Sequence, residues 1–226
     1  MSTLNDILPI EWQHSKLGIA RRRAWHPDMS CYMLGERHGL IVSSSIQYRR
    51  SLLRAIRVVQ EILSNGGHVW IVNTSPALAP IVEGLTNLVR NSVSYSSYAW
   101  TPGTLTNWHS VSRSVLSYGM FEQKCGKMLR DDSLEFPRYR RVRRHFKGLI
   151  SDNGLPAPLP DLIIMTNPGT NFRIVEEASR MHIPIIGFVE SDTQLKGITY
   201  PISMNLQNIQ HVYKTLQMIL SVVPRK

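Results

Sequence analysis

The chain has 226 residues, enough for one α/β domain with an appendage and a sizeable hydrophobic core. It carries 26 Lys and Arg residues against 16 Asp and Glu residues, a net charge of +10, and this excess favours a nucleic acid as partner. Its two cysteines form no CxxC motif, which argues against a disulfide framework or a zinc ribbon, and no apolar run is long enough for a membrane span.

The N-terminal stretch over residues 18–33 is basic and aromatic, and it follows a short amphipathic segment at 4–17. Arg21, Arg22 and Arg23 precede Trp25, and Pro27 requires extended or turned backbone before it. Cations beside an aromatic ring suit phosphates and stacked bases. A loop with Trp25 packed into the core accounts for the same residues equally well.

Residues 40–89 have the pattern of alternating strands and helices. A brief apolar strand at 40–42 precedes a helical period over 46–63, and another apolar strand covers 68–72 before a helix at 76–89. Gly66 and Gly67 suit a left-handed helix end. The sequence therefore predicts successive strand, helix and strand units in this region. The first helix also carries a basic stripe on its polar face, comprising Arg49, Arg50, Arg54 and Arg57.

The loop at 98–108 contains two tryptophans and several hydrogen-bonding side chains. Gly103 allows backbone conformations closed to other residues, so a Cβ there is expected to cause a clash or dihedral strain. Asn107 is placed to begin the next helix or to contact a partner. A well-packed turn explains the same composition.

Residues 110–154 have fewer apolar residues and more arginines than the rest of the chain. Two helical patterns, near 111–129 and 136–150, predict an antiparallel hairpin. No acidic residue lies between Glu135 and Asp152 to neutralise the second helix, so it gains from nearby phosphates. We expect residues 1–109 and 155–226 to form one α/β domain, with 110–154 inserted as a basic helical hairpin.

Residues 160–191 form a complete strand, loop, helix and strand unit. The apolar runs at 162–165 and 185–189 are typical of parallel strands buried on both faces, and the amphipathic stretch between them begins after Asn171, a plausible N-cap. This unit predicts an α/β fold with a parallel sheet flanked by helices.

Catalytic motifs are missing from the sequence. There is no P-loop, dinucleotide fingerprint, HExxH or GxSxG motif. The best enzyme candidate is the loop at 167–170, because open α/β sheets bind ligands beyond the ends of their strands. A phosphosugar-type enzyme using this loop is therefore the alternative function, and a free RNA-binding regulator is a third.

Several short motifs resemble those of the small ribosomal subunit protein 2 family. WTPGTLTNW at 100–108 resembles the family's WLGGMLTNW, and Leu159-Pro160-Asp161 before an apolar strand resembles its LPD block. WHPDM at 25–29, GER at 35–37, Glu177-Ala178 and Ile183-Pro184 resemble further family motifs. The matches run in the same order from about residue 4 to 212, so they cover nearly the whole chain.

The resemblance implies a Rossmann-like (flavodoxin-like) domain with a protruding helical hairpin and a structural role in the small ribosomal subunit. It implies small-subunit rRNA and neighbouring small-subunit proteins as partners, and no catalytic residue, cofactor, metal, membrane or small-molecule substrate. The family motifs also place Pro27 and Leu105 among contact positions. The residues that the basic clusters and the motifs together predict to bind RNA are Arg21, Arg22, Arg23, Trp25, Arg37, Arg49, Arg50, Trp100, Gly103, Thr106, Asn107, Trp108, Arg138, Arg140, Arg141, Arg143, Arg144 and Lys147.

The chain also departs from the family pattern. Pro102 replaces the first of two family glycines, and the acidic motifs expected near 190–196 and 203–208 are largely lost. Such drift favours a mitochondrial ribosome over the alternatives, a plastid ribosome or the bacterial cytoplasm. Because the matches begin almost at Met1, we expect synthesis inside the organelle or a mature or otherwise imported form.

Overall fold

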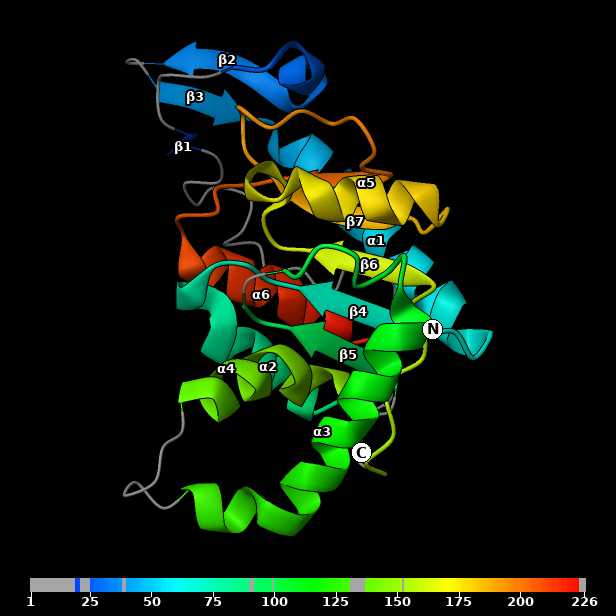
Figure 1. Cartoon of the computed structure of the whole chain (residues 1–226). Coiled ribbons are helices and arrows are strands. Elements are labelled where there is room, and N and C mark those ends of the chain that lie inside the picture. Colours follow the sequence, from blue (N-terminus) through cyan, green and yellow to red (C-terminus); the bar gives the residue numbers. More distant parts are fainter. Residues whose placement is uncertain are drawn as a thin grey trace.

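The computed structural model of the chain describes residues 19–20, 25–37, 40–89, 92–98, 100–130, 137–151 and 153–223. Its centre is a parallel sheet with helices on both faces (Figure 1). The strands lie in the order β5 (Val93–Ser96), β4 (Val69–Val72), β6 (Leu162–Met165), β7 (Ile185–Val189) and β8 (Tyr200–Ser203). Counted within this sheet the order is 2-1-3-4-5, as in flavodoxin, so the predicted fold class is confirmed.

Strands β5, β4, β6 and β7 are buried along their whole length. Their side chains alternate between two hydrophobic layers, as the period of a strand requires. Val69 and Ile71 of β4 pack on one side of the sheet, and Trp70 and Val72 pack on the other. A strand covered on both faces favours apolar residues at every position. This continuous apolar pattern is the one that predicted β6 and β7.

Asp161 connects the beginnings of the two central strands. One of its carboxylate oxygens accepts a hydrogen bond from the His68 backbone N–H at 2.8 Å, and its own N–H donates to the His68 carbonyl at 2.9 Å. The aspartate of the Leu-Pro-Asp motif thus sets the register of β6 beside β4.

Three helices cover one face of the sheet and two cover the other (Figure 1). The first face carries α1 (Ser45–Ser64), α2 (Ala79–Asn87, after the short 3-10 helix η3, Pro76–Leu78) and α6 (Ile209–Leu220). The second carries α5 (Phe172–Arg180) and the beginning of α3 (Trp108–Arg130). The predicted helix over 46–63 is confirmed as α1, which ends at Ser64 and is followed by Gly66, whose φ is +77°.

The strand predicted at 40–42 forms, but it does not belong to the parallel sheet. It is β3 (Leu40–Ser43), the middle strand of a separate antiparallel sheet between β1 (Ile19–Ala20) and β2 (Met33–Arg37). The predicted strand, helix and strand unit over 40–72 is therefore wrong, while the unit β4, α2 and β5 is real. Three apolar residues are too few to distinguish a strand buried on both faces from one in a small outer sheet.

The small sheet is attached to the main one through residues near 26–33. The 3-10 helix η2 (Pro27–Tyr32) buries Met29 against Val189 and Ile198. The His26 N–H donates to the Ser191 carbonyl at 2.8 Å, so this segment is fixed to the loop after β7.

Helices α3 and α4 (Pro137–Phe146) extend beside β5, at the opposite end of the molecule from β2 and β3 (Figure 1). The ring of Tyr118 on α3 lies 6.4 Å from that of Tyr139 on α4, measured between centroids. The 3-10 helix η5 (Lys147–Leu149) then passes against β5. A Cβ on Gly148 would lie 2.1 Å from the Tyr95 carbonyl oxygen, so this close approach requires glycine.

The sequence pattern predicts no helix or strand after Ser191. This region contains β8 at the sheet edge and α6, whose N-cap Asn208 accepts a hydrogen bond from the His211 N–H at 3.2 Å. β8 is a four-residue strand containing Pro201, and only its last two residues are buried. Edge strands tolerate proline, and such a short mixed pattern gives little periodicity to detect.

Two buried histidines predict a pH dependence of stability. Burial lowers the pKa of His68 and of His211 from 6.5 to about 4. As the pH falls from about 6.5 to about 4, the unfolded chain therefore binds protons that the native chain excludes, and the free energy of unfolding decreases.

Each histidine should contribute about 1.4 kcal/mol per pH unit inside this window and nothing outside it. Denaturant unfolding of wild type and His68→Gln between pH 7 and pH 4.5 should show a smaller slope in the variant. His109→Gln, which changes an exposed histidine, should keep the wild-type slope. Equal slopes for wild type and His68→Gln would contradict the assignment.

Candidate nucleic-acid interface

The most basic surface of the described chain is α4. Arg138, Arg140, Arg141 and Arg144 are exposed, and Arg143 is half-buried. We call these five residues the α4 arginine face. Residues 137–149 contain no acidic side chain.

Helix α4 is stabilised at both ends despite the repulsion among its like charges. Arg143, Arg144 and His145 lie in the last turn, where the helix dipole favours positive charge. The Tyr139 hydroxyl near the first turn donates to the Glu122 carboxylate on α3. The arginines are thus directed outward from a helix that is fixed at its apolar side.

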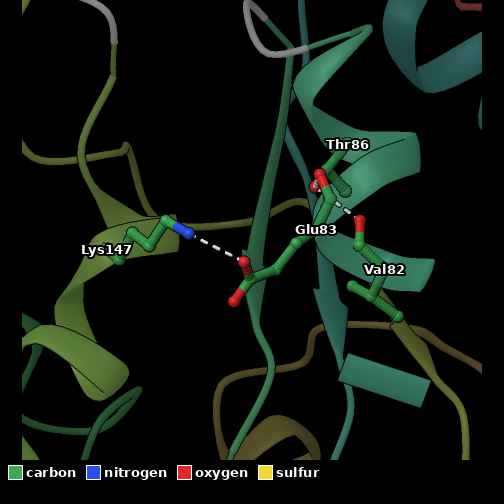
Figure 2. Close-up of polar contacts among 4 residues, drawn as sticks. All are labelled: Val82, Glu83, Thr86 and Lys147. Carbon is green, nitrogen blue, oxygen red and sulfur yellow. Dashed lines mark hydrogen bonds and ion pairs between the residues drawn. The ribbon is translucent and has the colours of Figure 1, made fainter. Parts of the chain in front are cut away.

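Lys147 differs from the arginines that precede it. Its Nζ lies 2.7 Å from Glu83 Oε2 on α2. Figure 2 shows the two side chains pointing toward each other. A partly exposed pair of this kind stabilises the fold by only about 0–1 kcal/mol, but it fixes the exit of the hairpin onto α2. The structure therefore gives the predicted RNA contact Lys147 an intramolecular partner.

Arg144 also has a neighbour within the chain. Its guanidinium carbon lies 5.7 Å from the centre of the Tyr98 ring, within the range of a cation–π contact. Such a contact orients the guanidinium plane without neutralising its charge, so it remains able to contact phosphate.

The basic stripe on α1 lies where the helical period predicted it. Leu52, Ile56 and Val59 are buried, whereas Arg50, Arg54 and Arg57 are exposed and Arg49 is half-buried. Among the predicted RNA contacts on this helix, Arg50 is therefore the more accessible. Helix α1 covers the sheet face opposite α5, so its arginines belong to a different surface from α4.

The loop between β5 and α3 is organised around one carboxylate. Glu177 on α5 is only 7% exposed, and three N–H groups of the loop point at it. The Trp100 indole N–H and the Gly103 N–H donate to Oε1 at 3.1 and 2.8 Å, and the Leu105 N–H donates to Oε2 at 3.0 Å. These donors face the protein interior, an arrangement the sequence did not indicate.

Glycine is required at position 103 because of its backbone conformation, not because a side chain would lack room. Its φ is +88°, and no atom lies within 4 Å of a Cβ built on it, so the expected clash is absent and dihedral strain remains. The Thr104 N–H donates to the Thr101 carbonyl at 3.2 Å, which closes a turn with Pro102 and Gly103 at its centre. Proline followed by glycine suits a type II turn, so the loss of the first family glycine is compatible with this loop.

The remaining predicted residues of this loop divide into packed and exposed ones. Trp108 packs against Trp70, with ring centroids 4.8 Å apart in an edge-to-face arrangement. Leu105 is fully buried, whereas Thr106 and Asn107 are exposed immediately before α3. A partner can therefore reach the Thr106 and Asn107 side chains.

The N-terminal candidates are only partly within the described residues. Trp25 is 44% exposed, which does not fit the alternative that packed it into the core. Pro27 begins η2. Arg37 ends β2, but its side chain, like Arg21, Arg22 and Arg23, lies outside what the structure describes.

Comparison with known proteins identifies the family. The sequence profile named Ribosomal protein S2 matches residues 15–225. The chain belongs to the ribosomal protein S2 family. As a member, it is a structural, non-enzymatic constituent of the small ribosomal subunit.

Individual S2 relatives agree with this assignment. Small ribosomal subunit protein uS2 of Gluconobacter oxydans is 29% identical over 187 residues, covering 81% of this chain and 69% of the relative. Small ribosomal subunit protein uS2m of Marchantia polymorpha is 26% identical over 204 residues, covering 87% and 82%. The uS2 protein of Paramagnetospirillum magneticum is 27% identical over 188 residues, covering 81% and 69%.

The enzyme alternative receives no support from family membership, and hydrogen bonds at the strand ends agree with this. The fully buried Asn73 follows β4, and its Oδ1 accepts hydrogen bonds from the Thr166 hydroxyl at 2.8 Å and the Ser75 N–H at 3.0 Å. The hydroxyl oxygens of Thr74, after β4, and of Thr170, after β6, lie 3.2 Å apart. Polar groups that could bind a ligand here thus bond to one another.

Within the ranges given above, no three His, Cys, Asp or Glu side chains are placed to hold a metal ion. None of the helices in those ranges is long and apolar enough to cross a membrane.

Removing the charge of Glu177 should loosen the loop of this S2 protein. In Glu177→Gln one oxygen becomes an NH2 group, which cannot accept the N–H bond that the carboxylate accepted. A buried hydrogen bond to a charged group is worth about 1.5–3 kcal/mol, so we expect a loss of roughly that size in unfolding free energy. Tryptophan fluorescence should report increased exposure of Trp100.

Glu176→Gln is the matched control, because Glu176 is the exposed neighbour on the same helix. It should leave both readouts within error of wild type. Equal losses in the two variants would show that the effect follows from the charge of α5 rather than from the loop.

Proposed function

We propose that this chain binds the rRNA of a mitochondrial small ribosomal subunit and that the α4 arginine face makes the principal phosphate contacts. The observation that carries the proposal is the exposure of four arginines on a ten-residue helix without an acidic residue. Lysine and arginine contacts to phosphate dominate the affinity of proteins for nucleic acids, because they release condensed counterions.

The other predicted contacts supplement this face. Arg49 and Arg50 on α1 form a second basic surface, and Trp25 provides an exposed ring at a third. Thr106 and Asn107 offer a hydroxyl and an amide at the root of the hairpin. In this proposal, residues 110–154 act as an inserted hairpin that reaches rRNA, while the α/β domain contacts neighbouring small-subunit proteins.

Two observations favour the mitochondrion over bacterial cytoplasm or a plastid. The family motifs have drifted, with Pro102 in place of glycine and the acidic motifs near 190 and 205 reduced. A relative named uS2m, from Marchantia polymorpha, is among those that the chain matches, over 82% of its length.

Sedimentation tests the assembly part of this function. A tagged full-length chain, expressed in its own cells, should migrate with small ribosomal subunits from the mitochondrial fraction on a sucrose gradient. Migration only as a free protein would favour the RNA-binding regulator instead. Recovery with ribosomes of the cytosol or a plastid would contradict the mitochondrial assignment while keeping the ribosomal one.

Salt dependence tests the role of the α4 arginine face. Changing Arg140, Arg141, Arg143 and Arg144 together to glutamine removes up to four phosphate contacts. The slope of log affinity for rRNA fragments against log salt should therefore become shallower by about three units. Filter binding between 50 and 300 mM KCl would measure it.

The corresponding fourfold change to lysine keeps the charges and should retain most of the slope. Circular dichroism would verify that both variants keep the α/β domain. The phosphate role is wrong if the glutamine variant keeps the wild-type slope.

A further inference from the structure

Helices α3 and α4 enclose two adjoining hollows. The outer one, of about 530 Å³, lies among side chains of α3 and α4 that include Phe121 and Tyr139. The inner one, of about 200 Å³, lies at the root of the hairpin, where Trp100 and Phe146 contribute to its wall. Ser114 and Val142 line both hollows, so the two adjoin each other, and we call them together the α3–α4 seam.

Aromatic rings line the seam at both ends, and several are held in place. The Tyr118 and Tyr139 hydroxyls both donate to the Glu122 carboxylate, which orients the two rings. The ring of Phe121 meets that of Tyr139 edge-to-face, with centroids 5.9 Å apart. Phe121 is nevertheless 44% exposed, which leaves part of this ring surface available to a ligand.

Positive charge accompanies each hollow. Arg138 lines the outer hollow and Arg141 the inner one, and both side chains are exposed. Residues three apart on a helix are neighbours on one face, so the two guanidinium groups follow the seam about one helical turn apart. Hydroxyl groups of Thr101 and Ser114 add hydrogen-bonding capacity to the inner hollow.

We infer that the α3–α4 seam binds an unpaired segment of RNA, with bases entering the two hollows and phosphates on Arg138 and Arg141. This inference rests on the proposed rRNA-binding function and names the kind of RNA that the hairpin takes. Proteins recognise single-stranded RNA by stacking its bases on aromatic rings and by neutralising its backbone with cations. The seam provides both aromatic rings and an arginine at each of its two hollows.

The volume of the inner hollow, about 200 Å³, favours a single base over a whole small molecule. Sites for whole small molecules usually measure about 300–1,000 Å³, so the inner hollow suits one flat ring system rather than a cofactor. A duplex keeps its bases paired and stacked, and it can reach only the arginines. An acidic peptide would satisfy the arginines too, but it would not use a row of flat aromatic surfaces.

Binding of short oligonucleotides to the full-length chain tests the inference. The probes are a fluorescent eight-nucleotide RNA single strand and a duplex of the same length. Wild type should bind the single strand more tightly at equal salt. Phe121→Ala should weaken single-strand binding about five- to 150-fold, the loss expected for one stacked base, and leave duplex binding unchanged.

Two matched controls separate the seam from general effects. Phe172→Ala removes a ring of similar exposure, 41%, on α5 and should not change single-strand affinity. The double variant Arg138→Gln and Arg141→Gln removes two positive charges three residues apart on α4. The double variant Arg54→Gln and Arg57→Gln removes two charges at the same spacing on α1. Only the α4 pair should reduce the preference for the single strand. Equal effects of a seam variant and its control would overturn the inference.

Cross-linking in assembled subunits distinguishes failure of this inference from failure of the proposed function. A photoreactive benzoylphenylalanine in place of Phe121 should cross-link to unpaired rRNA nucleotides. If the variant sediments with small subunits but cross-links to a protein or to paired rRNA, the seam assignment is wrong while the ribosomal function stands. Absence from small subunits would contradict the proposed function itself.

Discussion

Glu177 is the residue on which the loop between β5 and α3, and the helices that follow it, depend. Its carboxylate lies on α5 within the core of one sheet face, and it collects N–H groups from Trp100, Gly103 and Leu105. A buried carboxylate without such donors would be strongly destabilising, so the loop and the acid stabilise each other. Because α3 begins three residues after Leu105, the same contacts decide where the hairpin leaves the domain.

The hairpin carries its arginines at the surface and is held to the rest of the molecule by apolar packing and by paired polar side chains. Phe146 and Leu149 join the core of the α/β domain, and the Tyr139 hydroxyl is bonded to Glu122. Lys147 is paired with Glu83 (Figure 2). These contacts offset the repulsion among the arginines, which would otherwise disfavour the helix. The fold thus holds a high density of cations ready for a polyanion.

The chain uses an α/β fold without the ligand site that often accompanies it. In doubly wound sheets, ligands bind beyond the strand ends where the strand order reverses, here between β4 and β6. Asn73 and Thr166 occupy this position and hydrogen-bond to each other. A fold alone therefore does not determine an activity, and the function proposed for this chain lies on the α3 and α4 surface instead.

The sequence alone determined the features that depend on neighbouring residues. Continuous apolar runs identified β6 and β7, a helical period identified α1, and the arginine run identified the basic helix α4. The family motifs identified the fold class and the ribosomal role. In each case the signal lies within a few adjacent residues or in short motifs that can be recognised directly.

Tertiary structure decided the features that depend on distant residues. Glu177 is 72 to 77 residues from the loop groups it binds, and Lys147 is 64 residues from Glu83. No local pattern indicated that Trp100 and Gly103 would direct their N–H groups inward, or that β3 would pair outside the parallel sheet. The sequence around a hydrogen-bond donor or a strand edge is the same whichever group it pairs with. Only the packing of the whole chain selects that partner.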